Sequence, residues 1–330
     1  MRQMYLFCGF VLLGLWAFFP VQTAAARFTR TLPPELATPS TPINLDDLYR
    51  QADAANQLAD QFLAAMGQTK KVHPKMSIHN AQPRDIEVVS NALYDQVRAL
   101  AFEYTRETYE PQVKGDSLEK SWETLNQLLR ILYELQPILD QSKPLSIAQI
   151  NAKTPSDLVL LLINLNEKMD DLAWFEYSPS KAFQTVTQGI YIAAVLIENS
   201  PIPQSIPPAP VFIRGKTSQE NYQRLFAIMK TLNDIAKLKN IPFIQIEVED
   251  VSSAITSDVH NLATLINAQL LYLYHQVMPD GSVMQAYYPG WKFPSHIYQR
   301  SGVLEQQINQ LLHIARVHSN WLLHKQTQNG

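Results

Sequence analysis

Histidines and carboxylates are the side chains of this chain that could transfer protons or bind a metal ion, and eight histidines are present. A helical zinc motif places two histidines four residues apart on one helix face, whereas His313 and His318 are five residues apart. Local spacing therefore predicts no catalytic residue, no metal site and no cofactor. A catalytic site would need histidines of separate helices to meet an acid in one pocket. The candidates for such a site are His260, His275, His296 and His313.

Charged clusters elsewhere in the chain are short. The acids occur together as Asp46-Asp47, as Asp170-Asp171 and as Glu247 with Glu249. Adjacent acids on a helix point in different directions, and an acid at a helix start is stabilised by the helix dipole. We interpret all three groups as solvated structural acids. The basic residues around His73, from Lys70 to Lys75, are interpreted as a solvated loop.

The segment Arg214-Gly-Lys-Thr-Ser218 has the ending of a phosphate-binding P-loop. The full motif requires a glycine five residues before Gly215, and Pro210 occupies that position. We therefore reject the motif and expect Thr217 to cap a helix.

Five aromatic residues gather in the segment 278–300, where prolines and glycines predict turns rather than a helix. Two interpretations remain open. The rings either pack together as a plug at the open end of a helical bundle, or form a recognition surface, because Tyr and Trp combine apolar area with a polar group. The candidate binding residues are Tyr287, Tyr288, Trp291, Phe293 and Tyr298.

The elements that must position these residues are helices. In the stretches 82–100 and 154–172 the second residue is proline and Asp follows two residues later, and the apolar residues of both recur at helical spacing. Further amphipathic patterns begin at Asn44, Asp116, Ser178 and Thr217, and two more cover residues 251–277 and 303–323. These patterns predict an all-α fold of about eight antiparallel amphipathic helices, forming one or two helical bundles.

The chain is divided by segments rich in proline. Residues 27–43 are rich in Pro and Thr and are expected to form a leader that is disordered. Residues 200–216 form a Pro-rich connection, which would separate an N-terminal helical bundle at 44–199 from a C-terminal helical region at 217–330. Residues 241–249 alternate as a strand does, but without a recognisable partner strand they are expected to be an extended packed connection.

The N-terminus has the pattern of an export signal. Arg2 precedes an apolar run over residues 4–19, and Ala24 to Ala26 supply the small residues of a cleavage site. The run is too short to span a membrane, and no other segment reaches that length. Cys8, the only cysteine, lies within this run. A mature chain beginning at Arg27 would therefore have no disulfide and no cysteine nucleophile.

The overall balance of charge argues against nucleic-acid binding. Removal of Arg2 with the signal peptide changes the net charge from −3 to −4, whereas nucleic-acid binding usually needs a basic stripe. We expect an exported binding or interaction protein of the bacterial cell envelope, periplasmic or extracellular, which binds a protein partner or a small ligand. The alternatives are an exported hydrolase or lyase with a His/carboxylate site between helices, and a structural envelope component. The sequence predicts no oligomeric state.

Overall fold

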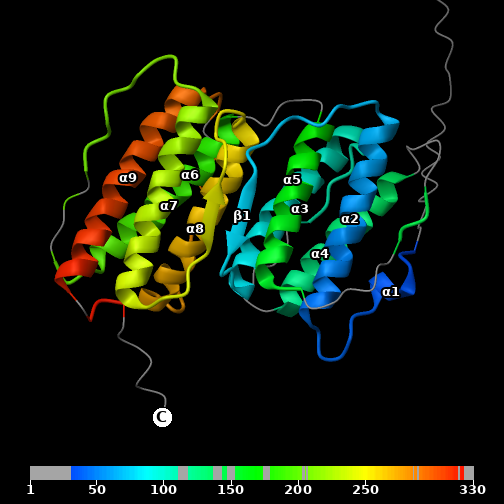
Figure 1. Ribbon diagram of the computed structural model, residues 1–330, viewed down its shortest axis with the longest axis horizontal. Coiled ribbons are helices and arrows are strands. Elements are labelled where there is room, and N and C mark those ends of the chain that lie inside the picture. The colour runs from blue at the N-terminus through cyan, green and yellow to red at the C-terminus, as the bar shows by residue number, and fades with distance from the viewer. Residues whose placement is uncertain are drawn as a thin grey trace, which may run out of the picture.

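The computed structural model confirms the expected all-α fold (Figure 1). It describes residues 31–110, 118–136, 143–146, 153–173, 179–202, 205, 207–284, 286–287, 290–318 and 320–322. Within these ranges the chain forms eight long helices, one short helix and two short strands. The helices are α1 (Pro34–Ala37), α2 (Leu45–Ala65), α3 (Pro83–Thr105), α4 (Leu118–Leu135), α5 (Pro155–Leu172), α6 (Pro179–Glu198), α7 (Ser218–Lys239), α8 (Thr256–Val277) and α9 (Pro294–Val317), and the strands are β1 (Met76–His79) and β2 (Gln245–Val248).

Several helices begin where the sequence predicts, and for the expected reason. Thr154 accepts a hydrogen bond from the backbone N–H of Asp157, whose carboxylate accepts one from the N–H of Thr154. Thr217 and Glu220 form the same reciprocal pair at the start of α7. These capping boxes satisfy backbone donors that have no partner within the helix. The local sequence therefore determines where these helices start.

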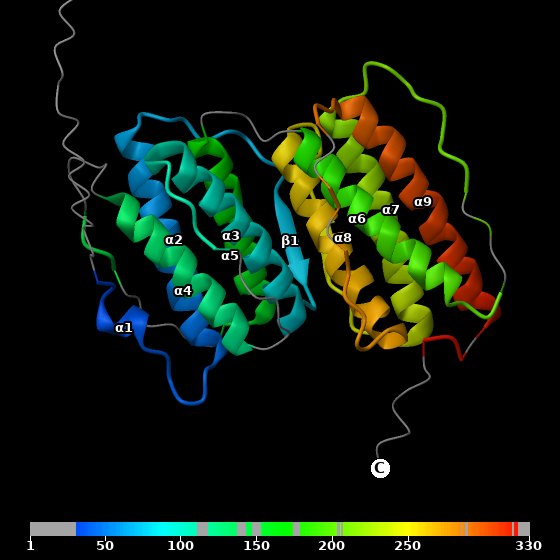
Figure 2. The ribbon, with the colours of Figure 1, turned by 180° about the vertical axis from the view of Figure 1, so that it is seen from behind.

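The long helices pack as two groups of four. In the first group, α2 and α3 each pack against both α4 and α5, and in the second group α6 and α7 each pack against both α8 and α9. The apolar residues that recur at helical spacing are buried at these contacts; they include Leu48, Leu93, Leu129, Leu162, Leu232 and Leu311. Figure 2 shows the two groups side by side.

Helix α6 corrects the expected grouping of helices. The sequence assigned it to an N-terminal bundle at residues 44–199, whereas it packs against α8 and α9. The Pro-rich connection at 200–216 therefore joins two helices of the same group, and the change of group falls between α5 and α6. A proline-rich segment shows where the chain is extended, but not which helices bury their apolar faces together.

A two-stranded antiparallel sheet joins the two groups. Along the chain, strand β1 comes between α2 and α3, and strand β2 comes between α7 and α8. Ile78 of β1 pairs with Ile246 of β2. The sequence pattern around β2 was interpreted as an extended connection without a partner. Its partner β1 is only four residues long and lies about 170 positions earlier, so local periodicity did not reveal the pairing.

Helix α8 lies at the junction of the groups, where it also packs against α3 and α5. It is therefore covered on nearly every side, and Ser257 through Leu270 are all buried. The polar residues among them must find partners inside the protein. Asn261, for example, hydrogen-bonds with Asn166 of α5.

At the N-terminus the structure describes the chain from residue 31 onward. The expected signal peptide, residues 1–26, lies outside the described residues. Residues 27–43 were expected to be a disordered leader. The described part of this segment packs against the protein, because Leu36 of α1 is buried and its carbonyl accepts a hydrogen bond of 3.2 Å from Gln51. Over the described ranges, no helix has both the length and the apolarity to cross a membrane.

Candidate functional site

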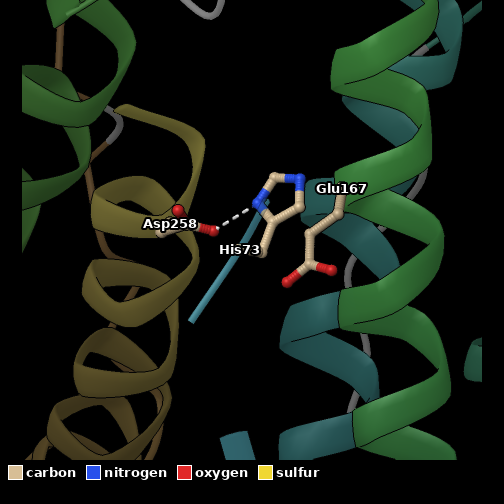
Figure 3. Close-up of side chains that lie close together, drawn as sticks. All are labelled: His73, Glu167 and Asp258. Atoms are coloured by element: carbon tan, nitrogen blue, oxygen red, sulfur yellow. Dashed lines mark hydrogen bonds and ion pairs between the residues drawn. The ribbon is translucent and has the colours of Figure 1, made fainter. Parts of the chain in front are cut away.

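A histidine and two carboxylates from distant parts of the chain meet between the two groups (Figure 3). His73 lies between α2 and β1, Glu167 lies on α5, and Asp258 lies in the first turn of α8. Each side chain supplies one ligand atom, and these atoms all lie within 4.8 Å of one another. The cluster depends on the packing of the two groups, because Glu167 belongs to the first and Asp258 to the second.

Asp258 contacts His73 and caps its own helix at the same time. Its Oδ1 lies 2.8 Å from Nδ1 of His73, and its Oδ2 accepts a hydrogen bond of 2.8 Å from the backbone N–H of Ile255. The helix start therefore fixes the carboxylate that orients the imidazole. If Nδ1 donates to Asp258, Nε2 carries the lone pair that could accept a proton or bind a metal. Nε2 is buried and has no hydrogen-bond partner among the described residues.

Glu167 is the least compensated member of the cluster. No hydrogen bond from any residue that the structure describes reaches its carboxylate, and burial raises its pKa to about 7. The positive charge of His73 opposes this rise, whereas Asp258 and Asp171 add to it. Burial by itself would lower the pKa of His73, but the hydrogen bond and negative charge of Asp258 outweigh it, so the pKa of His73 is raised. Glu167 can therefore exchange protons near neutral pH, and His73 holds its proton more tightly than a free imidazole does.

A second set of charges lies beside the cluster. The Lys71 ammonium lies 3.4 Å from Asp170 and 3.8 Å from Asp171. The side chains of both acids are nearly inaccessible to solvent, so their interpretation as solvated structural acids is wrong for this pair. Burial raises the pKa of Asp170, and the charge of Lys71 opposes the rise. The basic stretch 70–75 likewise does more than form a solvated loop, because it brings Lys71 and His73 to buried acids.

Tyr222 of α7 adds a hydroxyl to the same region. Its side chain is fully buried, and its hydroxyl has no hydrogen-bond partner among the described residues. Burial raises its pKa, and the charges of Asp258 and Glu167 raise it further. The hydroxyl therefore stays protonated and can act as a hydrogen-bond donor.

A polar pocket of about 410 Å³ opens beside the cluster, with His73 and Glu167 in its wall. Carboxamides, carboxylates and ammonium groups supply most of the other lining side chains; they include Asn56, Gln57, Asp60, Lys70, Asn164 and Lys168. Such a lining favours a hydrophilic ligand that can form several hydrogen bonds. An apolar cavity of about 70 Å³ inside the first group, near Phe62 and Leu172, offers no comparable chemistry.

Two kinds of chemistry are open to this arrangement. A half-buried carboxyl beside a histidine that is oriented by Asp can transfer protons to and from a bound substrate. One nitrogen and two carboxylate oxygens within 4.8 Å of one another can also surround a single divalent cation. The sequence predicted neither a metal site nor a catalytic site here. No local signal revealed this cluster, because the three residues come from separate segments.

The histidines named from the sequence lie elsewhere. His260 lines a separate cavity of about 200 Å³ with Glu87 and Asp95. Burial and the charge of Lys181 lower the pKa of His260 to about 3, so it is neutral. His296 packs between Phe212 and Phe293, with ring centroids 5.0 and 5.8 Å away. His313 is exposed on α9, and His275 is exposed on α8.

The five aromatic candidates do not share one environment. The exposed fractions of Tyr287, Trp291 and Phe293 are 82%, 88% and 64%, so these three do not plug the bundle. Tyr298 is half-buried on α9, with the Arg224 guanidinium 3.7 Å from its ring centroid. Tyr288 lies outside the described residues.

Comparison with known proteins gives no family assignment, since the chain matches no family model, no curated protein and no solved structure.

Proposed function

We propose that the chain is an exported enzyme, a hydrolase or lyase, whose acid–base site is formed by His73, Glu167 and Asp258. The observation that carries this proposal is the meeting of the three side chains beside a polar pocket of about 410 Å³. A half-buried histidine and carboxyl without full hydrogen bonding are costly to stability, and such costs are common at functional sites. Export to the cell envelope is the part of the proposal that comes from the N-terminal sequence alone.

The roles follow from the contacts. Asp258 positions His73 through Nδ1, which leaves Nε2 to take a proton from water or from the substrate. Glu167, on the opposite side of the junction, would supply a proton to the leaving group or take one away. The lining of the pocket by amides, carboxylates and ammonium groups favours a hydrophilic substrate rich in hydroxyl or amide groups.

The test is a search for turnover with matched variants. The mature protein is incubated with envelope glycans and peptides, and with fluorogenic glycosides, esters and amides, and the products are identified by mass spectrometry. A hydrolase adds one water to its products, whereas a lyase leaves an unsaturated product without added water. Glu167→Gln and His73→Asn should abolish turnover, while the exposed residues Glu198 and His313 allow control variants, Glu198→Gln and His313→Asn, that should retain it.

Two outcomes would count against the proposed enzyme. One is the absence of turnover on every substrate class, and the other is turnover that survives both Glu167→Gln and His73→Asn.

A binding protein without catalysis is the second candidate, and it matches the function expected first from the sequence. It is favoured by the spacing of the three ligand atoms, which suits one divalent cation. Calorimetric titration with Zn²⁺, Mn²⁺ or Ca²⁺ tests it. One ion bound per chain, lost in His73→Asn and retained in His313→Asn, would favour the binding role, particularly if no turnover is found.

A further inference from the structure

Trp291 is held outward by the fold. The hydroxyl of Ser180, at the start of α6, donates a hydrogen bond of 2.7 Å to the carbonyl of Gly290 and accepts one of 3.0 Å from the N–H of Lys292. These two bonds fix the backbone on both sides of Trp291, whose side chain is 88% exposed. Gly290 has a φ of +70°, a conformation that favours glycine. The exposure of Trp291 is therefore built into the structure.

A second apolar loop lies against the same region. Gln299 donates a hydrogen bond of 2.8 Å to the carbonyl of Pro210, and the N–H of Lys216 donates one of 3.0 Å to Ser295. Between these anchors, three successive apolar side chains, Val211, Phe212 and Ile213, are 85%, 39% and 48% exposed. The ring of His296 joins the loops, because it contacts both Phe212 and Phe293.

We refer to Val211, Phe212, Ile213, Trp291 and Phe293 as the apolar tip. It belongs to the segments that lead into α7 and α9, and both helices begin at the same end of the second group, the upper end in Figure 1.

The charges around the apolar tip are positive. Residues 207–217 and 281–300 contain no Asp or Glu, but they contain Arg214, Lys216, Lys292 and Arg300. Lys216 is paired with Glu220 of α7. Arg214 and Lys292 form no ion pair with any described residue, although the Lys292 ammonium lies 5.2 Å from the ring centroid of Phe183. The charges of Arg214 and Lys292 beside exposed aromatic residues are complementary to a surface that is negative outside and apolar beneath.

We propose that the apolar tip inserts into the headgroup region of a membrane that contains anionic lipids. Tryptophan and phenylalanine are favoured at the boundary between headgroups and acyl chains, and lysine and arginine side chains near an anionic bilayer are attracted to its surface. Burial of apolar side chains in the interface supplies the rest. The inference is independent of the proposed enzyme, because none of the five residues lines the pocket at His73.

The test is sedimentation of the mature chain, beginning at Arg27, with vesicles of phosphatidylcholine alone or mixed with phosphatidylglycerol. We expect binding to the mixed vesicles, weakened by salt, and a loss of about tenfold or more in Trp291→Ser/Phe293→Ser. Leu238→Ser is the matched control, because Leu238 is 52% exposed on α7 but lies outside the tip. Unfolding curves of all variants establish that each is folded.

Several outcomes would overturn the proposal. They are no sedimentation of the wild-type chain with mixed vesicles, equal binding to neutral vesicles, or an equal loss in Leu238→Ser. A folded double variant that loses only a protein partner, without any change in vesicle binding, would assign the apolar tip to protein recognition instead.

Discussion

The side-chain amide of Gln269 in α8 donates a hydrogen bond of 2.7 Å to the carboxylate of Asp85 in α3, and both side chains are buried. Asp85 also accepts a hydrogen bond of 2.7 Å from the backbone N–H of Gln82, at the start of its own helix. Asp258 forms a similar bridge: one carboxylate oxygen accepts a hydrogen bond from the N–H of Ile255, and the other hydrogen-bonds with the His73 ring. Two helix-capping carboxylates thus hold the two groups together, one through an amide and the other through an imidazole.

Gln269→Ala should destabilise the protein. The buried Asp85 carboxylate would lose a partner, and a cavity would replace the amide, so we expect the free energy of unfolding to fall by about 2–4 kcal/mol. Urea unfolding of the two proteins measures the change. Gln310→Ala removes an exposed hydrogen bond from the side-chain amide to the carbonyl of Ser205. This change should lower the free energy of unfolding by less than about 1 kcal/mol. Equal losses in the two variants would contradict a special role for the Asp85–Gln269 pair.

The helices could be predicted from the sequence because their determinants are local. Pro155, Asp157 and Thr154 lie within four residues of one another, and the capping box they predict is present. The buried apolar face of each helix was also predicted, since buried residues recur every three or four positions along a helix. What these patterns lack is information about which helices face each other. For that reason α6 was assigned to the first group, although it packs in the second.

The candidate site could not be predicted for a related reason. The sequence places His73 in a short basic stretch, and no local motif marks Glu167 or Asp258. The three side chains come together only when β1 pairs with β2 and α5 packs near α8. The aromatic residues were recognisable from composition, whereas their exposure depends on Ser180, which lies 111 positions before Trp291.

Lys71→Met should lower the free energy of unfolding, because Lys71 balances the charge of two buried acids. Loss of the ammonium leaves Asp170 and Asp171 without their nearby positive charge, and an uncompensated buried charge is expected to cost about 3 kcal/mol. The loss should shrink as the pH falls, because protonation of the acids removes the negative charges that Lys71 balances. Lys70→Met is the matched control, since Lys70 pairs with Asp60 at the surface and such pairs contribute about 0–1 kcal/mol. The measurement is urea unfolding over a range of pH, and a loss in Lys71→Met that is unchanged at acid pH would contradict the explanation.

Glu167→Gln should change how stability depends on pH. The pKa of Glu167 is raised from 4.5 to about 7 in the folded protein, so the folded state holds this proton more tightly than the unfolded state. The free energy of unfolding should therefore fall as the pH rises from about 4.5 to 7. The raised pKa of His73 acts in the same direction, because its stabilisation is complete below 6.5 and is lost as the pH rises through the folded-state pKa.

The variant removes the contribution of Glu167, so above pH 7 it should be more stable than the wild-type chain by about 1–3 kcal/mol. Below pH 4.5 the two proteins should converge, and Glu198→Gln should follow the wild-type curve throughout. Thermal unfolding at a series of pH values measures both effects. A Glu167→Gln variant that loses stability at high pH would show that the carboxylate has a favourable partner in the folded protein.

Gly189→Ala should destabilise the junction of α6 and α8, although alanine normally favours a helix by about 1 kcal/mol over glycine. A Cβ at position 189 would lie 2.6 Å from Oδ1 of Asn267 and 3.4 Å from a methyl group of Leu304. Asn267 cannot move freely, because its amide donates a hydrogen bond of 2.9 Å to the carbonyl of Thr185. Steric overlap should therefore outweigh helix propensity, with a net loss of about 1–3 kcal/mol. In Gly189→Ala/Asn267→Ala the overlap is absent, so the double variant should be more stable than the sum of the two single losses predicts. Strict additivity in urea unfolding would show that Asn267 does not limit the approach of α6 to α8.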